Sequence, residues 1–128
     1  MDGTPLFDAT LVEGRTLFVF EYKGGAVPAP VKHSFDPDKL LREIDRKYVG
    51  DRSKRKGVGQ LAHGILRVSQ ADELAALTRG TPVEAIQPIL VSLDSAITAP
   101  LVCKYLEEEC GRNIKTLMRC ARSDICWL

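Results

Sequence analysis

The feature that most constrains this chain is the segment 15–23, which reads Arg-Thr-Leu-Phe-Val-Phe-Glu-Tyr-Lys. Its aromatic and β-branched residues are typical of a β-strand, and the pair Gly24-Gly25 that follows ends the run. Because the apolar residues are almost continuous, we expect a central strand covered on both faces of its sheet. Glu21 and Lys23 stand two positions apart, so they point to the same face. Such charges are costly to bury unless they are paired or functional.

The residues ahead of this strand predict a β-hairpin. Segment 6–12 forms the first arm, and Glu13-Gly14 is the expected turn. A two-residue turn there places Asp8 diagonal to Glu21, whereas a four-residue loop places the two carboxylates directly opposite each other. Either even-length connection puts Asp8, Glu21 and Lys23 on one face, and an odd, unbulged loop would separate them.

Two carboxylates that converge beside an ammonium group form a site suited to a hard divalent cation. Mg²⁺ is usually held in proteins by one or two carboxylates, together with waters and substrate phosphates. The ion polarises a phosphodiester and activates a water, and the lysine can orient that water or offset charge in the transition state. The alternative is a cross-strand ion pair on an exposed sheet face, which is worth at most about 1 kcal/mol.

The hairpin resembles motifs of the PD-(D/E)XK nuclease superfamily, the restriction-endonuclease-like proteins. In that family an Asp lies on one strand and an acidic-x-Lys triplet lies on the next, about a dozen residues later. Here Asp8 precedes Glu21-Tyr22-Lys23 by a similar interval. The resemblance implies that Asp8, Glu21 and the Tyr22 carbonyl bind Mg²⁺, for which Mn²⁺ can substitute. It also implies that Lys23 is catalytic and that Gln60, on the helix that follows, takes part in catalysis.

The same resemblance sets the expected fold class. It is α/β, with a restriction-endonuclease-like core in which flanking helices cover a central mixed sheet. The family core runs α-β-β-β-α-β, and its first helix and first strand have no room ahead of Asp8. We therefore expect residues 1–128 to form a single nuclease-like domain that is incomplete at its N-terminus. Residues 97–128 would be a C-terminal helical extension, and another chain or an upstream segment would complete the fold.

The rest of the chain alternates between helical and extended patterns. Asp36 can cap a helix that Pro37 opens and Gly50 ends, with Phe35 and Leu40 as a hydrophobic staple. Proline-rich residues 26–32 should form a loop. The further expected elements are a helix over 58–68, a short helix that Ser69 caps and that ends at Arg79, a strand over 86–93, a helix over 100–110 that Gly111 ends, and a last helix over 113–122.

A cluster of basic residues links the first two of these helices. It consists of Arg52, Lys54, Arg55 and Lys56. Such a run is usually a solvated linker, but just ahead of the Gln60 helix it could also bind the phosphates of a nucleic acid. Residues 45–47, Asp-Arg-Lys, repeat the acidic-x-Lys pattern. We interpret that copy as a solvated helix face, because positions two apart on a helix diverge.

Composition narrows the class of protein. The 128 residues are 45% hydrophobic and 27% charged with a formal net charge of +1, which fits a globular domain and argues against bulk electrostatic coating of nucleic acid. No apolar run approaches the ~20 residues of a membrane span. The four cysteines, at 103, 110, 120 and 126, lack zinc-site spacing, so we expect reduced thiols in a cytoplasmic protein.

These observations lead to one main functional hypothesis. It is metal-dependent hydrolysis of DNA phosphodiesters, by an endonuclease or an exonuclease, with DNA as partner and a homodimer as a further option. The first alternative is a non-catalytic protein-binding or assembly module built on a nuclease-like fold. The second is a nucleic-acid binder that uses the basic linker without chemistry.

Overall fold

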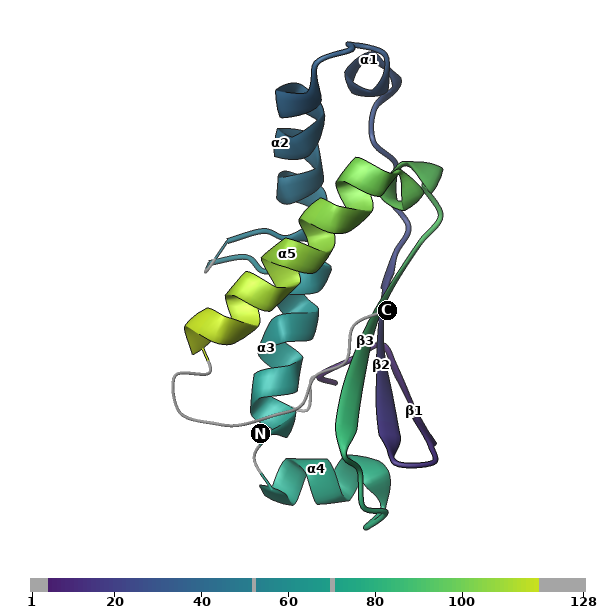
Figure 1. Ribbon diagram of the computed structural model, residues 1–128, viewed down its shortest axis with the longest axis vertical. Helices are drawn as coiled ribbons and strands as arrows, with labels where there is room; N and C mark the ends of the chain where they lie inside the picture. Colours follow the sequence, from purple (N-terminus) through teal and green to yellow (C-terminus); the bar gives the residue numbers. More distant parts are fainter. Residues whose placement is uncertain (1–4, 52, 70, 118–128) are drawn as a thin grey trace.

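The computed structural model describes residues 5–51, 53–69 and 71–117. It is an α/β structure in which helices flank a small three-stranded mixed sheet (Figure 1). The elements follow in the order β1 (Ala9–Glu13), β2 (Thr16–Lys23), α1 (Ala29–Lys32), α2 (Pro37–Tyr48), α3 (Val58–Val68), α4 (Ala71–Thr78), β3 (Ala85–Ser92), the 3-10 helix η1 (Ser95–Thr98) and α5 (Pro100–Leu117).

The sheet has the order β1-β2-β3, so β2 is the central strand, as its apolar sequence predicted. β1 runs antiparallel to β2, and β3 runs parallel to β2. Glu13 pairs with Thr16, so the hairpin turn is Gly14-Arg15, one position later than expected. Gly14 has a φ of +59°, and a two-residue hairpin turn with a positive φ at its first central position favours glycine there. Gly14 therefore takes the first position of the turn, not the second.

The two faces of the sheet differ, which corrects the prediction that β2 is covered on both. Among the odd positions of β2, Leu17 and Val19 are fully buried beneath the helices. Those at even positions, such as Phe18 and Phe20, are only half-buried. Figure 1 shows the reason, since α2, α3 and α5 all lie on the same side of the strands. We refer to the uncovered side as the outer face.

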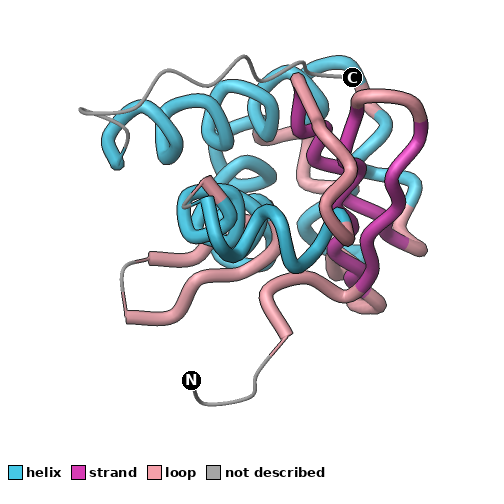
Figure 2. Tube along the Cα trace, turned by 90° about the horizontal axis from the view of Figure 1, so that it is seen from below, coloured by secondary structure: helices cyan, strands magenta, loops and turns pink. Residues whose placement is uncertain are grey.

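Helix α3 is the centre of the core and lies between the sheet and α5. Its buried Leu61 and Ile65 pack with the inner side chains of β2 and with Val102 and Leu106 of α5. Figure 2 shows these helices grouped to one side of the strands. Each such side chain contributes about 1.5–3 kcal/mol through burial. None of the described helices is long and apolar enough to cross a membrane.

The start of α2 confirms one predicted cap and contradicts the staple. Asp36 Oδ1 accepts hydrogen bonds from the main-chain N–H groups of Asp38 (3.1 Å) and Lys39 (3.3 Å). Phe35 is 96% exposed and has a positive φ of 55°, which turns its ring away from the helix, so it cannot contact Leu40 as a staple would. Gly50, with a φ of +74°, follows the end of α2 as expected.

The other helix boundaries show three differences from the predicted ones. Residues 29–32 form one helical turn, α1, within the expected loop. Ser69 ends α3, where its hydroxyl donates to the Ile65 carbonyl, instead of capping the next helix. Gly111 does not end α5, which continues to Leu117, because glycine costs a helix only about 1 kcal/mol. Residues 118–122 of the predicted last helix lie outside the described part of the chain.

Candidate metal and phosphate site

Asp8 is positioned by the residue before it. The ring of Phe7 is buried against Gly64 of α3, at a place where any larger side chain would collide with it. The Asp8 N–H then donates to the Phe20 carbonyl (3.0 Å), which joins this segment to β2. The Asp8 carboxylate accepts a hydrogen bond from the Tyr22 N–H, with 2.8 Å between Oδ2 and the nitrogen. Asp8 is therefore fixed at the start of β1, beside the end of β2.

The structure brings Asp8, Glu21 and Lys23 together. The strand pairing ends with Ala9 opposite Phe20, and Asp8 lies one residue before β1, with its carboxylate close to that of Glu21. Glu21 is 5% exposed, and its Oε1 lies 3.4 Å from Lys23 Nζ. Burial raises the pKa of Glu21, the negative charge of Asp8 raises it further, and Lys23 opposes the shift.

For the two other predicted site residues, Tyr22 and Gln60, the structure shows contacts that do not involve a metal or a substrate. The side chain of Tyr22 is 52% exposed on the outer face, so only its main chain can reach the carboxylates, and a Tyr22 metal ligand stays a prediction. Gln60 uses its side-chain oxygen to accept a hydrogen bond from the Gly57 N–H (2.9 Å) at the start of α3. This oxygen caps the helix, and a catalytic role for Gln60 also stays a prediction.

Beside this cluster lies a cavity of about 410 Å³ that we call the basic cavity. It is formed by the end of β2, the last turn of α2, the loop after α2 and the first turn of α3. Its lining residues are Lys23, Gly25, Arg46, Lys47, Tyr48, Lys54, Arg55, Lys56 and Gln60. The sequence pattern had placed Arg46 and Lys47 on a solvated helix face. Arg46 is exposed, as expected, and both residues also join the predicted basic residues, which the sequence could not show because the loop folds back beside α2.

The loop that carries these cations is fixed by its own main chain. Gly50 and Arg55 form an isolated antiparallel bridge, and the Lys56 N–H donates to the Val49 carbonyl (3.0 Å). Asp51 Oδ1 accepts from the N–H groups of Ser53 (2.8 Å) and Lys54 (2.9 Å). A side chain at Gly50 would collide with the loop's own backbone. Lys54, Arg55 and Lys56 thus lie in an ordered loop. Arg52, also predicted to bind nucleic acid, lies outside the described residues.

The cations of this cavity are only partly neutralised. Arg46 pairs with Glu43 (2.5 Å), and Lys47 donates to the Ala26 carbonyl. In the described part of the chain, no carboxylate lies within ion-pair distance of Lys54, Arg55 or Lys56. The pKa of the nearby His63 is lowered by burial and then by the positive charges of Arg55 and Arg67. The cavity therefore favours an anion.

The carboxylate pair is a suitable donor set for magnesium by its chemistry. Among residues 5–51, 53–69 and 71–117, no group of three or more His, Cys, Asp and Glu side chains could hold a metal ion. Transition metals prefer such groups, whereas Mg²⁺ needs one or two carboxylates and takes its remaining ligands from water and phosphate. Burial is the main reason that the pKa of Glu21 is raised, and the neighbouring Asp8 adds to the shift.

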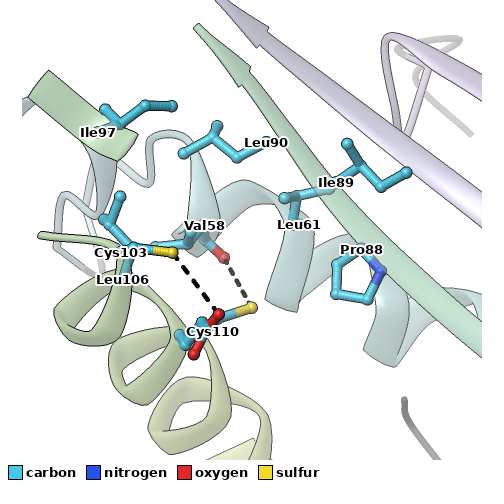
Figure 3. A pocket seen from close by; sticks show the side chains of 10 residues that line it. Val58, Leu61, Pro88, Ile89, Leu90, Ile97, Cys103, Leu106 and Cys110 are labelled. Atoms are coloured by element: carbon cyan, nitrogen blue, oxygen red, sulfur yellow. Dashed lines mark hydrogen bonds between the residues drawn. The ribbon is translucent and has the colours of Figure 1, made fainter. Parts of the chain in front are cut away.

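A second cavity, of about 180 Å³, is apolar and lies between β3, α3 and α5 (Figure 3). Cys103 and Cys110 line it as free thiols. Cys110 Sγ donates to the Val58 carbonyl (3.9 Å), and burial raises its pKa to about 12. Cys103 Sγ donates to Glu107, and burial followed by the negative charge of Glu107 raises its pKa. Neither of these two thiols is activated as a nucleophile. Cys120 and Cys126 lie outside the described residues, and the reduced state of the four cysteines stays a prediction.

Comparison with known proteins identifies no relative. No family model, no curated protein and no solved structure matches the chain.

Proposed function

We propose that this protein is a metal-dependent nuclease domain that hydrolyses DNA phosphodiesters and has a restriction-endonuclease-like core. The observation that carries the proposal is the position of Lys23, which contacts the buried Glu21 carboxylate (3.4 Å) and also lines the basic cavity. A carboxylate pair and a cationic cavity are thus contiguous. A purely structural ion pair would not require the second feature.

Each part of the site has a distinct role in this proposal. Asp8, Glu21 and the Tyr22 carbonyl would hold Mg²⁺ or Mn²⁺, and the bound ion would polarise the phosphodiester and activate a water. Lys23 would orient the attacking water and offset charge that develops on the phosphate. The cations of the basic loop would hold neighbouring phosphates of the strand. Gln60, at the edge of the cavity, would contact the substrate through its amide group.

The order of the elements supports the finer assignment of the fold. The hairpin that carries the acidic residues is followed, after α1 and α2, by α3 and, after α4, by β3, which is parallel to β2. This order is compatible with the end of the family core, with α1, α2 and α4 as additions to it. The first helix and strand of that core would come from another chain or an upstream segment, and the free cysteines are in keeping with a cytoplasmic setting.

We expect wild-type protein to cleave DNA in Mg²⁺ or Mn²⁺ but not in EDTA, and Asp8→Ala or Lys23→Ala to reduce the rate at least about a hundredfold. The measurement is cleavage of labelled single- and double-stranded DNA. Lys39→Ala, an exposed lysine on α2, is the matched control and should retain activity. Calorimetric titration with Mn²⁺ gives a second readout that does not need cleavage. Unchanged cleavage in Asp8→Ala, or no Mn²⁺ binding by the wild type, would contradict the proposal.

The basic cavity gives a separate prediction about binding. Neutralising Lys54, Arg55 and Lys56 to alanine should make the dependence of log K on log salt less steep, by about 0.9 for each phosphate of duplex DNA that the protein no longer neutralises. Fluorescence anisotropy at several salt concentrations measures this slope. A control with the exposed cations Lys39, Arg42 and Lys104 changed to alanine has the same net charge and should keep the wild-type slope. Equal slopes in the two triple variants would exclude the cavity as the phosphate site.

A second candidate function is favoured by one specific observation. The outer face of the sheet exposes apolar side chains, including Leu11 (52% exposed), Tyr22 (52%) and Val91 (37%). Such a face is typical of a protein contact and supports a non-catalytic assembly module on the same fold. That module would bind no divalent ion, so the Mn²⁺ titration distinguishes the two functions.

A further inference from the structure

The two edges of the sheet are not equivalent. β3 carries Pro88 within the strand, and a proline cannot donate a main-chain hydrogen bond to an added strand. α5 and α3 also approach this edge, because Ile89 and Leu90 line the apolar cavity together with Cys103 (Figure 3). β1 at the other edge contains no proline, and Figure 1 shows no described element beyond it. The free edge of β1 is therefore the one available for pairing.

The main-chain groups at this free edge can be assigned from the hairpin. Glu13 and Thr16 flank a two-residue turn, so they form a hydrogen-bonded pair. Hydrogen-bonded pairs alternate along an antiparallel ladder, so Leu11 also directs its N–H and C=O toward β2. Thr10 and Val12 consequently direct theirs to the free side. The free edge of β1 presents donors and acceptors that no described strand uses.

The edge is complementary to itself in one register. An antiparallel copy centred on Leu11 sets Leu11 against Leu11 of the partner subunit and Thr10 against Val12 of the partner subunit. Glu13 then faces Ala9 of the partner subunit, so no two like charges are opposed. Thr10 and Val12 become hydrogen-bonded pairs, as their main-chain directions require. An uncharged apolar centre that meets its own copy is what a two-fold interface needs.

The side chains of the outer face also favour pairing through β1. Leu11, Phe18 and Phe20 lie side by side on it, and the ring of Phe20 stacks on Tyr22 with 6.4 Å between ring centroids. Leu11 is 52% exposed at the margin of this apolar surface. Pairing through β1 would bury it against its own copy and extend the surface across both sheets.

We propose that two copies of this chain pair edge to edge through β1, antiparallel and with Leu11 on the two-fold axis, to form one continuous six-stranded sheet. This inference does not depend on the proposed function, because none of the residues that define it belongs to the carboxylate cluster or the basic cavity. The occupant of the edge is a second copy, since the register satisfies main-chain groups, side chains and charge with residues of β1 alone.

Sedimentation velocity over a range of concentrations tests the association. Wild-type protein is expected to reach twice the mass of one chain, and Leu11→Lys to remain monomeric because it places two like charges at the axis. Leu93→Lys changes another exposed leucine (88% exposed), outside β1, and should still dimerise. A wild-type protein that stays monomeric at every concentration would overturn the proposal.

Cross-linking tests the register. In a non-hydrogen-bonded antiparallel pair the Cα atoms are about 4.5 Å apart, within the range a disulfide accepts. Leu11→Cys should therefore form a dimer linked through position 11 under mild oxidation, as shown by mass spectrometry of the linked peptide. Thr10→Cys is the matched control, because its counterpart across the axis is Val12, and it should not link to itself. A dimer in which the Leu11→Cys variant fails to link, or in which the Thr10→Cys variant links instead, would show that the proposed pairing is wrong.

Discussion

Changing Glu21 to glutamine is expected to abolish metal-dependent cleavage and, in the absence of metal, to make the protein more stable. Glu21 is buried, and burial together with the charge of Asp8 raises its pKa, so the ionised carboxylate destabilises the metal-free fold at neutral pH. Glutamine keeps the shape of the side chain and removes the charge. It also removes a ligand of the proposed Mg²⁺ site, so cleavage should fall at least about a hundredfold.

The stability that Glu21→Gln gains over the wild type depends on pH in a direction that can be worked out. A carboxyl whose pKa is raised on folding binds its proton more tightly in the folded state, so the folded protein loses stability as pH rises above the ordinary glutamate pKa of about 4.5. The advantage of Glu21→Gln should therefore be present at neutral and alkaline pH and disappear near pH 4. A bound divalent cation supplies the missing positive charge and should remove the advantage as well.

Thermal melting in EDTA and in Mg²⁺ measures both effects. At a Mg²⁺ concentration of a hundred times Kd, the wild type should gain about 2.7 kcal/mol and Glu21→Gln nearly nothing. Glu13→Gln, an exposed carboxylate on the same hairpin, is the control and should behave as the wild type. If Glu21→Gln is less stable than the wild type in EDTA, the carboxylate serves mainly as the ion-pair partner of Lys23. A structural ion pair between Glu21 and Lys23 would then be preferred to a metal site.

Much of the carboxylate cluster could be predicted from sequence because strand geometry is local. The alternation of side chains in β2 places Glu21 and Lys23 on one face, and any even-length hairpin connection brings Asp8 to them. The choice between the two pairings could not be made, since it depended on which residue takes the positive φ of the turn. Gly14 does so at its first position, and the register follows.

The basic cavity could be predicted only in part because it is a tertiary feature. The basic run is visible in the sequence, but the ordered shape of residues 54–56 depends on Gly50, whose close contact with them has no periodic signal. Arg46 and Lys47 belong to the cavity only because the loop folds back beside α2. The uncovered outer face was missed for a similar reason. The aromatic side chains of Phe18 and Phe20 stand on the half-buried face, so the apolar run of β2 lacks the apolar–polar alternation that normally marks a strand covered on one face.

A second large effect on stability is expected at Asp94, a residue just after β3. Asp94 binds the segment that connects β2 to α1. Its side chain is 1% exposed and accepts hydrogen bonds from Lys32 Nζ (2.8 Å) and from the N–H groups of Val27 (2.5 Å) and Ala96 (2.9 Å). Burial alone would raise the pKa of Asp94, but these donors outweigh it and lower the pKa to about 2. The ionised carboxylate therefore stabilises the fold and fixes the connection between β2 and α1.

Asp94→Asn is expected to destabilise the protein by about 2 kcal/mol at neutral pH, the free energy that corresponds to the shift from the ordinary aspartate pKa to about 2. A carboxyl whose pKa is lowered on folding stabilises above its ordinary pKa, and this contribution is lost as pH falls from about 4 to about 2. Urea unfolding at a series of pH values should show the two proteins converging over that range. Asp36→Asn is the control, because asparagine caps a helix as well as aspartate does. A constant difference between wild type and Asp94→Asn down to pH 2 would show that the charge of Asp94 contributes little, and that its stabilising effect lies in hydrogen bonds that asparagine loses at every pH.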